Sequence, residues 1–96
     1  MTADRRVLVC YDCADDYRRN KVSRTLLDYG TRIQESVFEC IVEPALLEQM
    51  VERIRKLTDG WPEDRVCIVE LCSNCAGRVL TMGSSPRATA AHSTVV

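Results

Sequence analysis

The first apolar run of the chain, RVLVCY, is hydrophobic on both sides of the strand that it predicts. Val7, Val9 and Tyr11 share one side. Leu8 and Cys10 share the other side, so this strand has no polar face to turn toward water. A strand that is buried on both faces needs a covering layer on each of them.

Two longer segments carry apolar residues three or four positions apart, which predicts amphipathic helices. In residues 15–29 the apolar stripe consists of Val22, Leu26 and Tyr29. In residues 43–59 the stripe consists of Leu47, Met50, Ile54 and Leu57. The paired aspartates that open the first segment suit a helix N-terminus, because carboxylates accept hydrogen bonds from its unpaired N–H groups.

Three further segments are strand-like. Residues 31–42 form either a tight hairpin or one bent strand, residues 65–71 form a strand, and residues 78–82 form a short final one. The remaining composition, rich in Gly, Ser, Pro, Ala and Thr, predicts a flexible tail over residues 83–96. One domain over residues 1–82 therefore accounts for all the predicted elements.

The order strand, helix, two strands, helix, strand predicts a ferredoxin-like βαββαβ fold of the α+β class. In that fold a four-stranded antiparallel sheet carries both helices on one face. The other face must also be apolar, because the first strand is apolar on both sides. A second copy of the sheet is the simplest cover for it, so the sequence predicts a homodimer.

The chain has 96 residues and a formal net charge of −1, without the basic excess of most proteins that neutralise many phosphates. Residues 1–34 hold seven Lys and Arg against five Asp and Glu, whereas residues 35–64 hold three against eight. Any nucleic-acid surface must therefore be local. No apolar run reaches the length of a membrane span, and the N-terminus lacks the apolar core of a signal peptide. We therefore expect a cytoplasmic protein with six reduced cysteines.

Asp12 stands where the first strand ends, a position from which side chains project into ligand sites. Its carboxylate is either a ligand for Mg²⁺, which prefers oxygen, or a turn or helix-capping group. A two-fold axis near the strand end would add the second copy's aspartate. The neighbouring basic cluster is either a phosphate-binding strip or a solvated helix face. Its members are Arg18, Arg19, Lys21, Arg24 and Arg32.

Two CxxC pairs raise the question of structural zinc. Cys10 lies within a strand, where its side chain cannot turn to share a metal with Cys13. Cys72 and Cys75 follow a strand and are freer, but they supply two ligands, and two copies would be needed for four. For this second pair, zinc ligation and ordinary thiols both stay open.

Three blocks of the sequence carry a family resemblance: VLVCYD, then DDYRRNKVSRTLLDYGTRIQESVFEC, then VCIVELCSNC. In this order and spacing, over residues 6–82, the chain resembles the CRISPR-associated endoribonuclease two family, the small partner of the CRISPR adaptation integrase. The resemblance implies the same ferredoxin-like homodimer, in which the last short strand pairs with the partner subunit. It also implies metal-dependent cleavage of single-stranded RNA or double-stranded DNA, and a place between two integrase dimers that hold new spacer DNA.

The resemblance further implies roles for single residues. Asp12 corresponds to the metal-binding and catalytic aspartate, and one Mg²⁺ would be shared between the two copies of Asp12. The corresponding nucleic-acid-binding positions are Tyr11, Arg19, Lys21, Arg32, Ser36 and Phe38. The residues alone suggest a bend for Ser36 and sheet packing for Phe38.

Two functions share this fold, this dimer and this basic strip. The first is a metal-dependent endonuclease that takes part in spacer acquisition. The alternative is a non-catalytic homodimeric scaffold that bridges integrase dimers and holds spacer DNA. A regulatory ferredoxin-like dimer that binds a small metabolite is a third interpretation. Substitution of Asp12 by alanine separates the first two, because only cleavage depends on that carboxylate.

Overall fold

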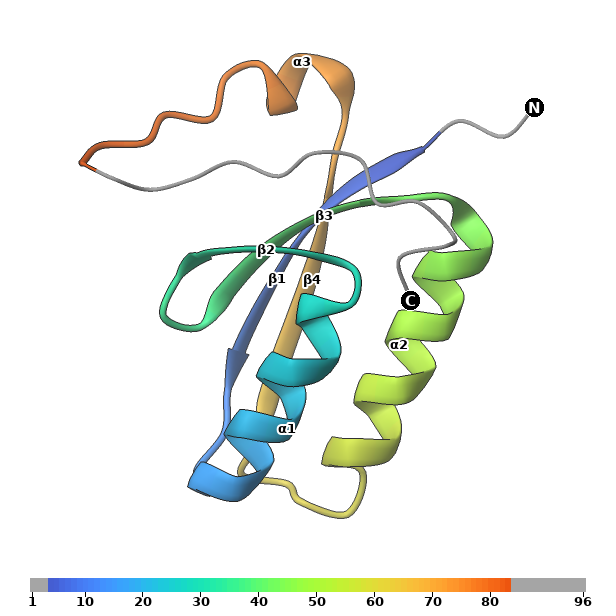
Figure 1. Cartoon of the computed structure of the whole chain (residues 1–96), viewed down its shortest axis with the longest axis vertical. Helices are drawn as coiled ribbons and strands as arrows, with labels where there is room; N and C mark the ends of the chain where they lie inside the picture. Colours follow the sequence, from blue (N-terminus) through green and yellow to red (C-terminus); the bar gives the residue numbers. More distant parts are fainter. Residues whose placement is uncertain (1–3, 84–96) are drawn as a thin grey trace.

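An antiparallel sheet is built around strand β1 (Arg5–Asp12) in the computed structural model, which describes residues 4–83. Strand β3 (Val37–Val42) pairs with one edge of β1 and strand β4 (Arg65–Leu71) with the other. Strand β2 (Gly30–Gln34) is bonded to the outer edge of β3, which gives the order β2-β3-β1-β4 (Figure 1). The predicted ferredoxin-like fold is confirmed, and the strand-like segment from 31 to 42 is a hairpin.

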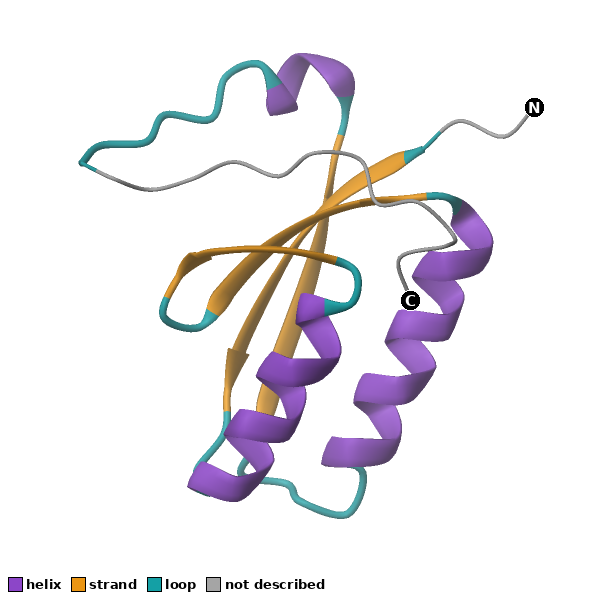
Figure 2. Ribbon diagram, in the orientation of Figure 1, coloured by secondary structure: helices purple, strands orange, loops and turns teal. Residues whose placement is uncertain are grey.

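Two long helices lie together on one face of this sheet (Figure 2). Helix α1 (Asp16–Leu27) begins after Asp15, whose carboxylate accepts a 3.0 Å hydrogen bond from the N–H of Arg18. Helix α2 (Pro44–Thr58) begins with proline, which has no N–H to leave unpaired in the first turn. Both start signals were therefore correctly predicted. No helix in the described part of the chain is long and apolar enough to cross a membrane.

The hydrophobic core lies between the helices and the sheet. Strand β1 contributes Val7, Val9 and Tyr11, which are at most 4% exposed, as the two-sided pattern predicts. The remaining core side chains are Cys13, Val22, Leu26, Tyr29, Phe38, Cys40, Val42, Leu46, Met50 and Ile54. The predicted stripe of α2 is confirmed at its centre, whereas its outer members Leu47 and Leu57 are only partly buried.

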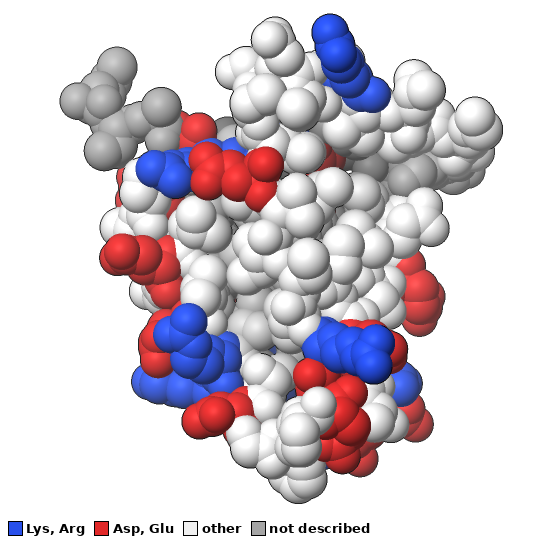
Figure 3. All heavy atoms as spheres, turned by 180° about the vertical axis from the view of Figure 1, so that it is seen from behind, with Lys and Arg blue, Asp and Glu red and all other residues white. Residues whose placement is uncertain are grey.

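Neither α1 nor α2 covers the opposite face of the sheet, and we call it the open face. The alternate residues of β1, β3 and β4 point to this side, because the strand register pairs them with one another. Their uncharged members are Leu8, Cys10, Val37, Ile41, Cys67, Val69 and Leu71. In the view onto this face the centre of the surface shows no Lys, Arg, Asp or Glu, and charged side chains gather around it (Figure 3). Beneath that surface, Glu39 shares this side of the sheet with Leu8 and is fully buried, and Arg6 binds its carboxylate at 2.6 Å. The predicted second apolar face is thus confirmed apart from this ion pair.

The chain after β4 differs from the prediction. A single helical turn, α3 (Ser73–Ala76), follows the strand, and residues 78–82 form no strand in one protomer. A strand needs a hydrogen-bonding neighbour, and none of the four strands described between residues 4 and 83 pairs with this segment, in which Leu80 and Met82 are each 87% exposed. The expected pairing of this segment with a partner subunit stays a prediction. Apart from Gly83, the predicted tail lies outside the described residues.

Gly30 directly follows the segment predicted to be the first helix, residues 15–29, a place typical of a glycine that ends a helix. In the structure it is the first residue of β2, and Asp28 is the C-terminal cap of the helix. The backbone of β3 explains why glycine is needed. A Cβ atom on Gly30 would lie 2.9 Å from Cα of Cys40, and nearer still to its Sγ and to the carbonyl oxygen of Glu39. Such contacts cannot be relieved by rotating a flexible side chain, so β2 can approach β3 this closely only through glycine.

Gly30→Ala is therefore expected to lower the free energy of unfolding by about 1–3 kcal/mol, the usual cost of overpacking a filled site. Denaturant unfolding followed by circular dichroism measures the change. Gly77→Ala is the matched control, since its Cβ would meet no atom closer than 3.7 Å and its φ is −75°. Equal stabilities for the two variants would contradict the close approach of β2 to β3.

Candidate functional site

Asp12 is the last residue of β1, and its exposed side chain lies at the rim of the open face. It has the same orientation as Leu8 and Cys10, because alternate strand residues share a face, and it is paired in register with Arg65 of β4. Among residues 4–83, no ion pair or hydrogen bond engages its carboxylate. An exposed carboxylate without a structural partner is available to a ligand.

Arg19 of α1 is attached to the backbone just after the end of β1. One of its nitrogens donates a 2.9 Å hydrogen bond to the carbonyl oxygen of Cys13, the residue that follows Asp12. Another nitrogen pairs with Asp16, and the Arg19 side chain is still 41% exposed. Arg19 is thus held near Asp12 by the backbone and keeps part of its guanidinium open to solvent.

The β2–β3 turn lies at the same end of β1. The N–H of Tyr11 donates to the carbonyl oxygen of Ser36 at 3.1 Å, which ties the turn to the strand end. Arg32 donates to the carbonyl oxygen of Glu35 at 3.0 Å and to the hydroxyl of Ser23. Arg32 therefore lies on the helix side of the sheet, whereas Asp12 points to the open side. We call Asp12, Arg19, Arg32 and Ser36 the β1-end residues, since all four lie near the end of β1.

Tyr11 and Phe38 are core residues. They are 4% and 0% exposed, and their ring centroids lie 6.2 Å apart beneath the helices. The guanidinium of Arg32 lies over the Phe38 ring, 5.2 Å from its centroid. In this conformation neither ring reaches the surface, and the ring of Phe38 instead supports the side chain of Arg32.

Lys21 lies on a different side of α1 from Arg19. Two residues along a helix turn the side-chain direction by about 200°. Lys21 therefore lines a groove between α1 and α2. The other residues of this groove are Arg24, Thr25, Asp28, Arg53, Lys56 and Leu57. The predicted basic strip is thus divided between two sites. Arg19 lies near the end of β1, whereas Lys21 lies in the groove between the helices, which the sequence did not predict.

Arg18 belongs to a structural network and is only 13% exposed. Its guanidinium binds Asp64 at 2.6 Å and stacks on Trp61, 3.9 Å from the ring centroid. The hydrogen bond from Arg18, with a further one from the N–H of Ala14, holds the pKa of Asp64 below its usual value. This network joins the β1–α1 loop to the α2–β4 loop, and no spacing in the sequence predicted it.

The metal ligands available within one protomer are few. Among the described residues, no group of three or more His, Cys, Asp or Glu side chains could hold a metal ion. The free carboxylate of Asp12 is of the type that Mg²⁺ prefers, and Mg²⁺ commonly uses one or two carboxylates together with water and phosphate. One copy therefore fits as half of a shared site.

The first CxxC pair does not have the geometry of a metal site. Cys13 is 1% exposed in the core, whereas Cys10 lies on the open face, so the two thiols point to opposite sides of the sheet. Burial raises the pKa of Cys13, and proximity to Asp64 raises it further, which disfavours the thiolate that a metal requires. The sequence argument against a shared metal at this pair is supported.

Comparisons with known proteins identify the family and the fold. Residues 5–79 match the family described as CRISPR associated protein Cas2. The chain belongs to the Cas2 family. It is 39% identical over 80 residues to a CRISPR-associated endoribonuclease Cas2 of Rhodospirillum rubrum. That match covers 83% of this chain and 64% of the relative, so the chain spans less than two thirds of that protein.

Solved Cas2 structures share the fold. Streptococcus pyogenes Cas2 superposes with a TM-score of 0.71 at 35% identity, over 81% of this chain and 99% of that one. A chain of a partial Cas6-RT-Cas1–Cas2 complex gives a TM-score of 0.70 at 26% identity, over 81% of this chain and 84% of that one. A Cas2-like chain therefore occurs within a complex that contains Cas1.

The Arg18–Asp64 pair in this Cas2-family chain makes stability depend on pH. The folded state holds the pKa of Asp64 below its ordinary value of 3.8, so it favours the ionised carboxylate. This contribution is complete above that value and is lost as the pH falls through the lowered pKa. Asp64→Asn should lower the thermal midpoint at pH 7, and the gap to the parent protein should narrow below about pH 4.

Calorimetric scans from pH 7 to pH 3 measure this dependence. Glu63→Gln is the matched control, since it removes an exposed neighbouring carboxylate and should change the midpoint little at any pH. A gap between Asp64→Asn and the parent protein that stays constant with pH would show that the carboxylate charge is not what stabilises the fold.

Proposed function

We propose that this chain is a metal-dependent endonuclease of CRISPR spacer acquisition that acts on phosphodiester bonds as a homodimer. One observation carries the proposal: the unpartnered carboxylate of Asp12 lies at the rim of the open face, and the guanidinium of Arg19 is bonded to the carbonyl oxygen of the following residue, Cys13. The face supports dimerisation, the carboxylate supports metal binding and the guanidinium supports phosphate binding. The relatives' names, which include endoribonuclease, support the same reaction class.

The open face supports pairing with a second copy. Val69 is 43% exposed at a position that would be buried in a sheet covered on both sides. The surface around it is apolar, and an apolar patch of this kind usually marks an interface. In a two-fold contact both copies use the same face, so Asp12 at the rim of one copy would lie on the same interface as the partner's Asp12.

The two carboxylates are of the type that would hold Mg²⁺, which when bound polarises a phosphate and lowers the pKa of a coordinated water. The chain's own residues do the positioning. Arg19 would bind a non-bridging phosphate oxygen through its exposed nitrogens, while Cys13 keeps the side chain oriented. Arg32, oriented by Phe38 and Ser23, would contact the next phosphate along the strand.

Lys21 would act through the groove between the helices and not together with the β1-end residues. Its ammonium lies 5.2 Å from the centroid of Tyr17, on the exposed side of α1. The positive charge of Lys21 would attract the nucleic-acid backbone at long range. Ser36 contributes through its carbonyl, which holds the end of β1 in place.

A non-catalytic scaffold is the second candidate. It is favoured by the occurrence of a similar chain in a complex with Cas1, and by the lack of a complete metal site in one protomer among the described residues. In this function the homodimer would bridge integrase dimers and hold spacer DNA through the same arginines. The two candidates differ only in whether the carboxylate of Asp12 takes part in the reaction.

Asp12→Asn is expected to lower Mg²⁺-dependent cleavage by about 100-fold or more, because it removes the charge that would hold the metal while preserving shape. Labelled single-stranded RNA and duplex DNA, each with and without Mg²⁺, provide the measurement. Glu48→Gln, at an exposed position of α2, is the matched control and should cleave normally. Unchanged cleavage by Asp12→Asn, or no cleavage by the parent protein together with normal spacer integration, would favour the scaffold.

Val69→Arg is expected to raise the dimer dissociation constant by about 100-fold or more, since the substitution places two like charges in one symmetric interface. Sedimentation velocity over a concentration series measures the change. Leu27→Arg, which also replaces an exposed apolar side chain but on the helical side, should leave dimerisation unchanged. A dimer insensitive to Val69→Arg and disrupted by Leu27→Arg would assign the interface to the helices.

A further inference from the structure

Helix α3 is a single turn organised by two thiols. Cys72 is its N-terminal cap, and the Sγ atom of Cys72 accepts a hydrogen bond from the N–H of Cys75 at 3.3 Å. Both cysteines are exposed. A cap residue and the third residue of the following helix lie within one turn, so their side chains meet without any movement of the backbone.

The two thiols are chemically unequal. Hydrogen bonds from the backbone N–H and the thiol of Cys75 lower the pKa of Cys72, because they favour its thiolate. The same contact raises the pKa of Cys75. Two exposed thiols in contact, one with a lowered pKa, form an arrangement that suits thiol–disulfide exchange.

The other cysteines are less suited to such exchange. Cys13 and Cys40 are buried, and burial raises the pKa of Cys40 to about 12. Cys10 and Cys67 are paired in register on neighbouring strands of the open face, where burial raises the pKa of Cys10 and the neighbouring Cys67 raises it further. Only the α3 pair combines two exposed thiols, mutual contact and a lowered pKa among the described residues.

We propose that Cys72 and Cys75 form a reversible disulfide, which makes α3 a thiol–disulfide exchange site. The thiolate of Cys72 attacks a small-molecule disulfide such as oxidised glutathione, forms a mixed disulfide and releases one glutathione thiolate. The thiol of Cys75 passes its proton to that thiolate and attacks Sγ of Cys72, which releases the second glutathione. The second glutathione leaves as a thiolate and takes up from water the proton that Cys72 lost on ionisation. Counted from the dithiol, the protein loses two electrons and two protons, and one glutathione disulfide becomes two thiols.

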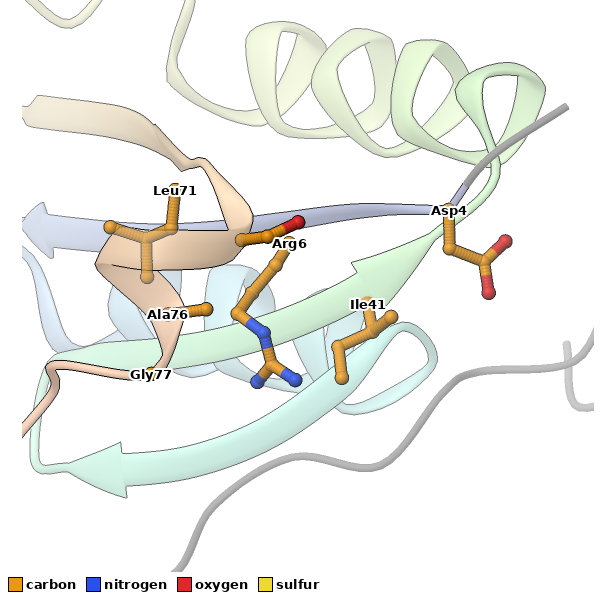
Figure 4. A pocket seen from close by; sticks show the side chains of 7 residues that line it. Asp4, Arg6, Ile41, Leu71, Ala76 and Gly77 are labelled. Carbon is orange, nitrogen blue, oxygen red and sulfur yellow. The ribbon is translucent and has the colours of Figure 1, made fainter.

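The place of α3 gives this step a structural consequence. The helix connects β4 to residues 78–82, the segment expected to contact the partner subunit. It folds back over one end of the open face, where Ala76 and Gly77 line a pocket together with Arg6 and Ile41 (Figure 4). One helical turn has little stability of its own, so a covalent link across it should reduce its opening.

The test equilibrates the full chain with reduced and oxidised glutathione, blocks the remaining thiols with an alkylating reagent and digests with trypsin. The peptide from Val66 to Arg78 holds Cys67, Cys72 and Cys75. In the oxidised protein we expect the mass of this peptide to show the loss of two hydrogen atoms and the addition of one alkyl group, on Cys67. Without denaturation, cleavage after Arg78 should become several-fold slower in the oxidised protein.

Matched variants separate this proposal from the alternatives. Cys67→Ser should oxidise and slow cleavage as the parent protein does, whereas Cys72→Ser and Cys75→Ser should show neither effect. The proposal would be overturned by any of three results. These are a disulfide between Cys10 and Cys67, the absence of an internal disulfide in excess oxidised glutathione, and the formation of mixed disulfides alone. So would one zinc ion bound per two chains after purification with zinc, because four thiolates would then be metal ligands.

Discussion

The two-sided character of β1 is the constraint on which the rest of the structure depends. Its alternate side chains are apolar in both directions, so the central strand has to be covered on both faces. The helices meet that need on one side and bury Val7, Val9 and Tyr11. On the other side Leu8 and Cys10 stay partly exposed, and this uncovered face locates the proposed dimer and puts Asp12 at its rim.

The fold could be predicted from the sequence because its signals are local. The stripe of α2, the capping aspartate of α1 and the alternation of β1 each follow from the spacing of a few residues. The predictions that were wrong concern contacts between segments that are distant in the sequence. Gly30 has a spacing that suits a helix end, and only the backbone of β3, ten residues away, shows why no side chain fits there. Residues 78–82 have the composition of a strand but pair with no strand among residues 4–83.

Only part of the candidate site could be predicted, again because local signals are visible in the sequence and contacts between distant segments are not. The strand that positions Asp12 is visible in the sequence, and so is the basic character of α1. The sequence does not show which arginine is already engaged. Arg18 and Arg19 are adjacent, yet Arg18 is held by Asp64 and Trp61 from the far end of α2, whereas Arg19 is held by a carbonyl next to Asp12. Tyr11 and Phe38, which the family resemblance assigns to nucleic-acid binding, lie in the core.

The open face also determines how strongly the proposed dimer interface would respond to a single substitution. In a symmetric contact every position occurs twice, so each substitution contributes its energy from both copies. A side-chain change of about 0.7 kcal/mol per copy would shift the dissociation constant roughly tenfold. Small variations at Leu8 or Val69 would therefore be enough to move the protein between a permanent pair and a transient one, and to prevent related chains from mixing in one cell.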